Sequence, residues 1–329
     1  MKPLQLIFGL MIAALGLWFA SSIFIEPTPP QVARTFESSV SCKDCHQEVY
    51  AEWEGSQHSI SWTNPAVRAL SNEFANQDCI DCHAPRPVFV SGIGERVLPR
   101  ASRRVEGVDC ITCHLLPENP DGTPGGMAGT IANANAACRP VQRVELQRVE
   151  FCAGCHDQHE TVRQWRASEW PARGEDCLSC HMPYRNGDPN SGRDHTCLGG
   201  NSLALLKSAV ELRGVRVGEG WKIEVENVGA GHSFPTDERS RAADVFWRPV
   251  GNETWQHLYR FRSPYRFEVD IVDNLLLAHE TRNIALEEPE AQGAVEVALF
   301  YKRSPHYEDP DAPDPEREAT LVQRIVLEP

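Results

Sequence analysis

Basic residues are scarce in this chain of 329 residues, which has 32 Lys and Arg against 46 Asp and Glu. The formal net charge is therefore −14 at neutral pH. A protein that binds nucleic acid tightly needs clustered positive charge to neutralise phosphates. The composition argues against nucleic acid as a partner and is compatible with a basic protein partner.

Apolar sequence is also scarce between residues 41 and 198, which have too little of it for an ordinary core in a segment of that length. Residues 117 to 140 are rich in Gly, Pro, Asn and Ala and predict a loop. Something other than side chains must therefore fill the interior of this segment.

A five-residue pattern, Cys-x-x-Cys-His, occurs five times in the same segment. Its cysteines are Cys42, Cys45, Cys79, Cys82, Cys110, Cys113, Cys152, Cys155, Cys177 and Cys180, and its histidines are His46, His83, His114, His156 and His181. This pattern is the attachment signature of haem c. Two sulfurs bond to two vinyl groups on one edge of the macrocycle, and the following imidazole lies under the iron as its proximal ligand. Five covalently bound haem c groups would supply the missing core.

Zinc sites and redox dithiols are the alternative, because Cys-x-x-Cys pairs also build zinc ribbons and knuckles. Such sites do not need a histidine directly after the second cysteine. With 12 His in the chain, five such histidines by chance have a probability on the order of one in ten million. The sequence therefore favours a pentahaem c-type cytochrome.

Each low-spin electron-transfer haem needs a second, distal axial ligand. Methionine is rare, with four residues in the chain, so histidine is the expected ligand type. The candidates are His58, His159, His195 and His232. His58 follows a predicted helical face, and His159 lies one turn beyond His156. Asp194 could orient His195, and the turn from Gly231 to Thr236 makes His232 rigid.

Three further histidines, His257, His279 and His306, are interpreted as strand, loop or solvated residues. Four distal candidates for five haems leave one haem open, capped by a weaker histidine, or ligated by Met127 or Met182. Two cysteines, Cys138 and Cys197, belong to no motif. In an oxidising compartment they predict one disulfide, with two unpaired buried thiols as the alternative.

The N-terminus predicts export, because an apolar run from Leu4 to Ile25 follows Lys2. Residues 1–25 are either a signal peptide cleaved near Ala20 or an uncleaved membrane anchor, since the run is long enough to span a bilayer. Residues 26–40 predict a linker. Haem c attachment takes place outside the cytoplasm, so a periplasmic or other extracytoplasmic location is expected.

Two domains are expected after the linker. Residues 41–200 predict a mostly α and irregular pentahaem domain. Residues 201–329 predict an all-β, sandwich-like domain, because apolar and polar residues alternate between turns. The predicted strands lie at 221–225, 245–247, 267–271, 295–301 and 321–327.

An imperfect Trp-x-x-Ser repeat begins at Trp53 and again at Trp165. His58 in the first copy corresponds to Trp170 in the second. The repeat indicates either two chance Trp-Ser pairs or a duplicated haem-pair unit whose second copy has lost its distal histidine.

Several of these pieces resemble the multihaem cytochromes c of the hydroxylamine-oxidoreductase superfamily, especially the group around the nitrifier tetrahaem electron-carrier cytochrome. The matching pieces are Cys42-x-x-Cys45-His46 with Trp53-x-x-Ser56-x-His58, Gly107-Val108-x-Cys110-x-x-Cys113-His114, Trp165-x-x-Ser168, Cys177-x-x-Cys180-His181-Met182-Pro183, Asp194-His195 with Gly199-Gly200, and Gly231-His232-x-Phe234-Pro235-Thr236. The resemblance implies closely stacked, mostly bis-His haems. The chain departs from the group in having five motifs and a β-rich C-terminal region, and it lacks both an eight-haem catalytic set and a Cys-x-x-Cys-Lys motif.

The expected function is electron transfer along a chain of haems. The expected partners are redox proteins, either a quinol-linked membrane donor or a periplasmic oxidoreductase, with membrane contact through the N-terminal segment if it is uncleaved. One alternative is an enzyme that reduces or oxidises a small nitrogen or sulfur species at one open haem. Another is an interaction subunit whose β-domain docks into a larger complex.

Overall fold

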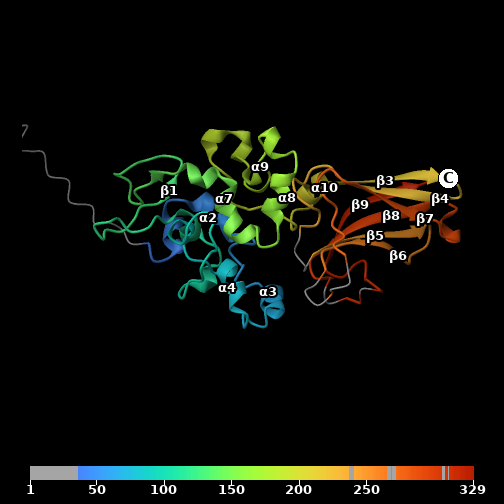
Figure 1. The fold of residues 1–329 in the computed structure, drawn as a ribbon, viewed down its shortest axis with the longest axis horizontal. Coiled ribbons are helices and arrows are strands. Elements are labelled where there is room, and N and C mark those ends of the chain that lie inside the picture. Colours follow the sequence, from blue (N-terminus) through green and yellow to red (C-terminus); the bar gives the residue numbers. More distant parts are fainter. Residues whose placement is uncertain (1–35, 237–240, 265–267, 269–271, 306–307, 310) are drawn as a thin grey trace, which may run out of the picture.

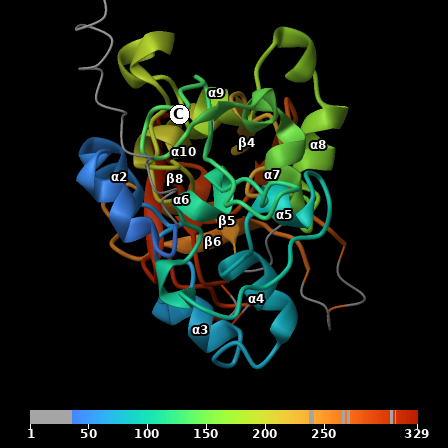
Figure 2. The same ribbon diagram turned by 90° about the vertical axis from the view of Figure 1, so that its left-hand side faces the viewer.

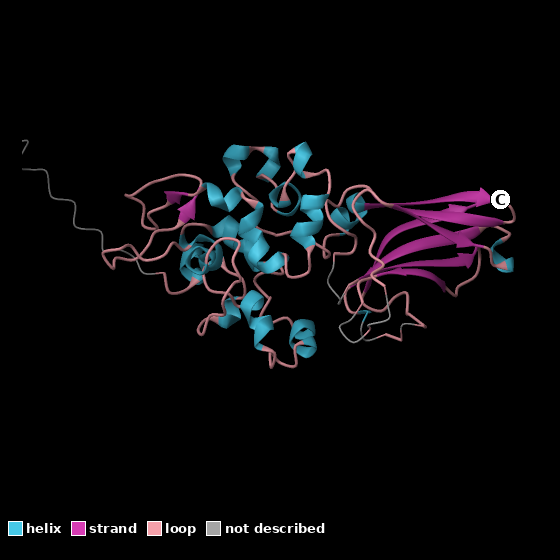
Figure 3. Cartoon of the chain, in the orientation of Figure 1, coloured by secondary structure: helices cyan, strands magenta, loops and turns pink. Residues whose placement is uncertain are grey.

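A computed structural model describes residues 36–236, 241–264, 268, 272–305, 308–309 and 311–329. A helical part and a β part lie next to each other along the long axis (Figure 1, Figure 3). The predicted signal or anchor, most of the linker, His306 and most of the predicted strand at 267–271 lie outside the described residues. Within those described ranges, no helix has the length and apolarity needed to cross a membrane.

The helical part consists of short helices joined by loops, and no described helix is longer than eight residues. Its α-helices are α2 (Gln47–Glu54), α3 (Pro65–Leu70), α4 (Gln77–His83), α5 (Val88–Ser91), α6 (Cys110–His114), α7 (Val149–His156), α8 (Thr161–Ala167), α9 (Cys177–His181) and α10 (Leu203–Ala209). Its 3-10 helices are η1 (Ser39–Asp44), η2 (Arg104–Glu106), η3 (Val144–Gln147), η4 (Pro171–Arg173), η5 (Arg185–Gly187) and η6 (Pro189–Ser191). Two short strands pair in parallel: β1 (Ala128–Gly129) interrupts the predicted loop region, and β2 (Val141–Gln142) directly follows it.

Side chains form only a small core in the helical part. Its described hydrophobic cluster consists of Phe74, Ile80 and Ala84, with Trp62 and Val67 packed against them. The large apolar cluster of the molecule lies in the β part. This distribution agrees with the expectation that side chains alone do not fill the helical part.

The β part contains two antiparallel sheets, as the alternating sequence predicts. One has the strand order β3 (Val210–Val217), β4 (Gly220–Asn227), β7 (Thr281–Leu286). The other has the order β6 (Gln256–Phe261), β5 (Ala242–Pro249), β8 (Val295–Lys302), β9 (Ala319–Leu327). A 3-10 helix, η7 (Pro289–Ala291), connects β7 to β8.

The two sheets share one core, to which alternate residues of facing strands contribute. Ile223 and Val225 on β4 and Val297 and Leu299 on β8 are all fully buried in this cluster. Strands with this alternation place one set of side chains on the inner face. Helix α10 packs onto the same core through Leu206 and Ala209, at the junction with the helical part (Figure 1).

Glu308 and Asp314, in the proline-rich acidic segment that follows β8, contact buried charged residues of the sheet. Lys302 at the end of β8 is fully buried, and its Nζ donates to the Glu308 carboxylate and to the Asp314 carbonyl. The Arg260 Nη2 lies 2.7 Å from a Glu308 oxygen and 2.7 Å from an Asp244 oxygen. Buried charges that are paired in this way hold the segment against the outer face of the sheet.

Candidate haem centres

Four of the five Cys-x-x-Cys-His motifs lie on short helices that end at the motif histidine: α4, α6, α7 and α9. In the first motif, Cys42 lies in η1 and His46 directly precedes α2. Residues at i, i+3 and i+4 of a helix share one face. The two thiols and the imidazole of each helical motif therefore point to the same side, as attachment to one haem edge requires.

Two of these helices begin with the same capping arrangement. The Asp109 carboxylate accepts the Thr112 N–H at 2.8 Å, and the Asp176 carboxylate accepts the Ser179 N–H at 2.8 Å. In both cases the hydroxyl of the third helical residue also bonds back to the aspartate. Such capping boxes fix the start of a helix, here one residue before the first motif cysteine.

Three motif histidines face three of the predicted distal histidines. The ring centroids are 6.1 Å apart for His156 and His58, 6.2 Å for His114 and His195, and 6.2 Å for His181 and His232. These pairs join residues that are 98, 81 and 51 positions apart in the chain (156−58, 195−114, 232−181). His58 follows the first motif in sequence but faces the proximal histidine of the fourth.

These separations fit one metal ion between each pair of rings. An imidazole nitrogen ligates a metal at about 2.0 Å, and its ring centroid lies about 1.2 Å further away, so two trans imidazoles have centroids about 6.3 Å apart. The observed 6.1–6.2 Å agree with this value. Each pair could therefore hold the iron of one haem, with two cysteines of the same motif bonded to its edge.

Five of the site histidines use Nδ1 to donate a hydrogen bond to a backbone carbonyl. The acceptors are Ser61 for His83 (2.8 Å), Ala128 for His114 (2.8 Å), Leu198 for His181 (2.5 Å), Arg193 for His195 (2.9 Å) and Ser233 for His232 (2.9 Å). A bond of this kind fixes the tautomer and orients the ring. It leaves Nε2 as the nitrogen available to iron.

Burial lowers the pKa of five paired imidazoles and so favours their neutral form. It lowers the pKa of His58 and of His232 to about 4, and neighbouring histidines add to the effect. Burial also lowers the pKa values of His114, His156 and His195. The neutral ring is the form that ligates a metal.

Other predicted site histidines lie in different surroundings. The His83 ring is 5.6 Å from the Phe74 ring, and His159 is close enough to Cys82 and His156 to influence their charges. His46 lies close enough to His114 to affect its charge. The roles of His46 and His83 as proximal ligands and of His159 as a distal ligand stay predictions, as do the ligand roles of the six paired histidines.

The two weaker candidates in the β part have other partners. His257 on β6 lies 3.9 Å from an Asp244 oxygen, and its ring meets Phe246 edge-on. His279 lies 3.0 Å from a Glu169 oxygen and stacks on Trp170. Neither belongs to one of the three histidine pairs.

Cysteines of different motifs also meet. The side chains of Cys42 and Cys110, of Cys82 and Cys155, and of Cys152 and Cys177 lie within hydrogen-bonding reach of each other. The first motif is therefore next to the third, and the fourth is next to both the second and the fifth. Cys113 of the third motif is close enough to Cys152 and Cys155 of the fourth for their charges to interact.

The predicted disulfide between Cys138 and Cys197 is wrong, since both are free thiols in the structure. The Cys138 carbonyl accepts the Met127 N–H in the loop beside β1. Cys197 instead lies near Cys113 of the third motif, beside the loop that carries His195. Cys138 and Cys197 therefore lie in different loops and have different neighbours.

Glu52 on α2 positions the loop that delivers His195. Its carboxylate binds the Arg185 guanidinium through two contacts of 2.6 Å and accepts the His195 backbone N–H at 2.9 Å. The hydrogen bond from Arg185 lowers the pKa of Glu52, so the carboxylate stays ionised. Sequence analysis did not identify Glu52, because nothing near it in the chain marks its partner.

Asn227, at the end of β4, positions the loop that carries His232. Its buried side-chain amide donates to the His232 carbonyl at 2.9 Å and accepts the Ala230 N–H at 3.0 Å. The next residue, Ser233, donates its N–H to the Gln164 side chain on α8 at 3.1 Å. The loop after β4 is thereby fixed both to the sheet and to the helical part.

Gly231 lets this loop approach the helical part closely. A Cβ at this position would lie 3.0 Å from Trp165 Cδ1 and 3.1 Å from Trp170 Cγ. Such distances are shorter than ordinary packing contacts. A larger residue directly before His232 would require the two indole rings to shift by a few tenths of an ångström.

The Trp-x-x-Ser repeat corresponds to a repeated contact. The Trp53 indole N–H donates to the Val108 carbonyl at 2.8 Å, and the Trp165 indole N–H donates to the Glu175 carbonyl at 3.2 Å. Both carbonyls lie two residues before the first cysteine of a motif, Cys110 and Cys177 respectively. Each tryptophan thus packs against the start of a motif helix with an aspartate–hydroxyl capping box.

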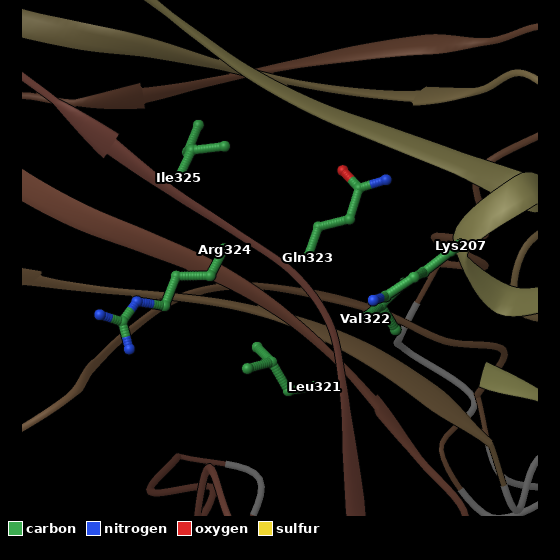
Figure 4. A pocket seen from close by; sticks show the side chains of 6 residues that line it. All are labelled: Lys207, Leu321, Val322, Gln323, Arg324 and Ile325. Atoms are coloured by element: carbon green, nitrogen blue, oxygen red, sulfur yellow. The ribbon is translucent and has the colours of Figure 1, made fainter. Parts of the chain in front are cut away.

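A separate surface depression lies between α10 and β9, away from these centres (Figure 4). It is lined by Lys207 and by residues 321–325. None of its lining residues is a predicted site residue.

Comparisons with known proteins found a family match over part of the chain and a structure with a similar fold. The protein-family model described as "Cytochrome c554 and c-prime" matches residues 41–115. No curated protein matches the chain. A penta-heme cytochrome c552 from Thermochromatium tepidum has a similar fold, with 18% identity and a TM-score of 0.61 over 88% of this chain and 98% of the other.

An oxidised superoxide reductase aligns with 37% of this chain and 88% of its own, at 10% identity and a TM-score of 0.21, which is too low to support an argument. The broader resemblance to the hydroxylamine-oxidoreductase superfamily stays a prediction. The family match and the shared fold support a multihaem cytochrome c, which is the class that the five motifs predict.

Proposed function

We propose that this protein carries five c-type haems and transfers electrons between redox proteins outside the cytoplasm. The observation that carries the proposal is the set of three histidine pairs with centroids 6.1–6.2 Å apart. An iron with two imidazole ligands exchanges electrons but has no open position for a substrate. The haem supplies the redox chemistry, while the protein sets ligands, spacing and burial.

The contacts between motif cysteines support a connected route. The first and third motifs adjoin through Cys42 and Cys110, and the second, fourth and fifth adjoin through Cys82–Cys155 and Cys152–Cys177. The nearness of Cys113 to the fourth motif links the two groups. Electrons entering at the first or second motif could thus reach every other centre without leaving the protein.

The attachment of haem c and the charge of the chain suggest where the protein works and what it binds. Haem c is attached outside the cytoplasm, so we place the mature protein in the periplasm or another extracytoplasmic space. A quinol-linked membrane protein or a periplasmic oxidoreductase would serve as donor or acceptor. With a net charge of −14, the protein suits a partner with a basic docking face.

Mass spectrometry of the denatured holoprotein tests the haem content. Five haems should remain attached, because thioether bonds survive unfolding. Zinc together with fewer haems would contradict the proposal.

Electron paramagnetic resonance of the oxidised holoprotein tests the ligands. At least three centres should be low-spin with two imidazoles. His232→Ala should convert one of them to high spin and let it bind carbon monoxide, whereas His257→Ala, the matched control in the β part, should leave all signals unchanged. A native high-spin haem in stoichiometric amount that turns over nitrite or hydroxylamine would replace the carrier with an enzyme.

A further inference from the structure

Two aromatic rings form a parallel stack beside His83. The Trp62 and Phe74 centroids are 4.2 Å apart with an interplanar angle of 3°, and the Phe74 centroid lies 5.6 Å from that of His83. Phe74 packs against Ile80 on α4 and against Ala84, which directly follows His83 at the end of this helix. The stack therefore lies on the same side as the motif helix and continues outward from the proximal imidazole.

An unusual backbone conformation holds Phe74 in this position. Asn72, Glu73 and Phe74 have φ angles of 49°, 58° and 61°, so three consecutive non-glycine residues are left-handed. Residues with a side chain rarely adopt this conformation, because the Cβ atom lies too close to the following carbonyl oxygen. The Phe74 N–H donates to the Ser71 hydroxyl at 3.0 Å, which helps to fix the turn. Strain of this kind is concentrated at functional sites.

The outer end of the stack reaches the surface and is flanked by positive charge. Trp62 is partly exposed, and the guanidinium carbons of Arg104 and Arg68 lie 5.2 Å and 5.8 Å from its ring centroid. Arg68 pairs with the Glu73 carboxylate, which leaves one uncompensated positive charge in this group. Leu70 nearby is 45% exposed. A positive, partly apolar patch of this kind suits an anionic partner, although the chain as a whole is acidic.

The second motif also lies near the surface of the helical part. It contacts the fourth motif through Cys82 and Cys155. Both views of the ribbon place α3 and α4 together at an outer edge of the helical part (Figure 1, Figure 2). A centre at the edge of the helical part, next to a surface stack, is where electrons would enter or leave.

We propose that Trp62 and Phe74 form the electron-exchange port of the haem attached at Cys79 and Cys82, and that Arg68 and Arg104 orient an anionic redox protein on it. The inference rests on the proposed function, because it requires a haem at this motif. A haem held by Cys79, Cys82 and His83 would supply the redox chemistry. In the outward direction it would lose one electron, a one-electron acceptor on the partner would gain it, and no bond or proton would be exchanged.

Two small oxidants of opposite charge test the port by stopped flow on the fully reduced holoprotein. They are hexacyanoferrate(III), an anion, and tris(phenanthroline)cobalt(III), a cation. The double variant Arg68→Gln/Arg104→Gln should slow the reaction with the anion about threefold to tenfold and leave the cation rate unchanged or higher, because local charge steers encounter. Trp62→Leu should slow both reactions. Unchanged rates in these variants would overturn the proposal.

Trp255→Leu is the matched control, because Trp255 also lies under an arginine, with the Arg248 guanidinium carbon 4.3 Å from its ring centroid, but in the β part. It should leave both rates unchanged. If Trp62→Leu fails to fold or loses a haem, the surface double variant still decides the question. A protein without five haems would refute the proposed function itself, whereas five haems with unchanged rates would refute only the port.

A second measurement does not depend on electron transfer. The eight tryptophans can be labelled with 5-fluorotryptophan and the Trp62 resonance assigned with Trp62→Phe. Hexacyanochromate(III), a paramagnetic anion, should broaden the fluorine signal of Trp62 more than that of Trp255 in the holoprotein. The Arg68→Gln/Arg104→Gln variant should abolish this difference. Equal broadening of both signals in the unmodified protein would contradict an anion-binding port.

Discussion

Asn227→Ala should loosen the loop that carries His232. The Asn227 side chain is fully buried and makes two short hydrogen bonds, to the His232 carbonyl at 2.9 Å and from the Ala230 N–H at 3.0 Å. Each buried partner that loses its hydrogen bond costs about 1–3 kcal/mol. The two together predict that the free energy of unfolding falls by about 2–6 kcal/mol.

The same substitution should change the spectrum of one haem. The His181 and His232 rings are at the spacing that two ligands of one iron require, so a small shift of the loop breaks the distal bond. In Asn227→Ala, one low-spin centre should become partly high-spin in the oxidised protein, and the reduced protein should bind carbon monoxide. Urea unfolding, electron paramagnetic resonance and carbon monoxide titration measure the three effects.

Asn252→Ala is the control, because Asn252 also accepts a backbone N–H, from Thr254 at 2.8 Å, but on an exposed turn. Surface substitutions of this kind usually change stability by less than about 0.5 kcal/mol, and the haem spectrum should not change. If Asn227→Ala loses the expected stability but keeps every haem low-spin, Asn227 supports the sheet without positioning His232. If Asn227→Ala lowers the free energy of unfolding by less than about 1 kcal/mol, the two hydrogen bonds of Asn227 do not stabilise the fold as proposed.

Three further substitutions test the helical part. His58→Ala should remove the same low-spin signal as His156→Ala, since the two rings face each other at 6.1 Å; loss of a different signal would refute the pairing. Glu52→Gln should lower the free energy of unfolding by about 1–2 kcal/mol in urea titrations, because the lost ion pair is partly exposed. Arg100→Met should lower the free energy of unfolding by about 1–3 kcal/mol, because Asp109, 3.2 Å away and fully buried, loses one of its two arginine partners and keeps Arg103; a loss below about 0.5 kcal/mol would show that this ion pair contributes little.

The sequence located features that depend on local spacing. The Cys-x-x-Cys-His pattern requires only five consecutive residues, and period-two alternation identified β4, β5, β8 and β9. His195 and His232 were selected from their flanking residues, and each now faces a motif histidine. Local patterns were sufficient for the motifs and the strands, because their backbone geometry depends mainly on residues that are close together in the chain.

Pairing across the chain could not be predicted in this way. Nothing around His58 indicates that its partner is His156 rather than the nearer His46. Glu52 and Asn227 were missed, because acidic and amide residues are common and their role depends on distant backbone atoms. The disulfide failed for the related reason that a count of leftover thiols contains no information about distance.

The duplicated tryptophan contact explains how the helical part meets the β part. His58 lies five residues after Trp53, and Trp170 lies five residues after Trp165 (58−53 and 170−165). In the first copy, His58 faces the proximal histidine of a motif in the second copy. In the second copy, Trp170 at the equivalent position stacks on His279 of the β part at 5.8 Å. The equivalent position therefore contacts a motif histidine in the first copy and the β part in the second.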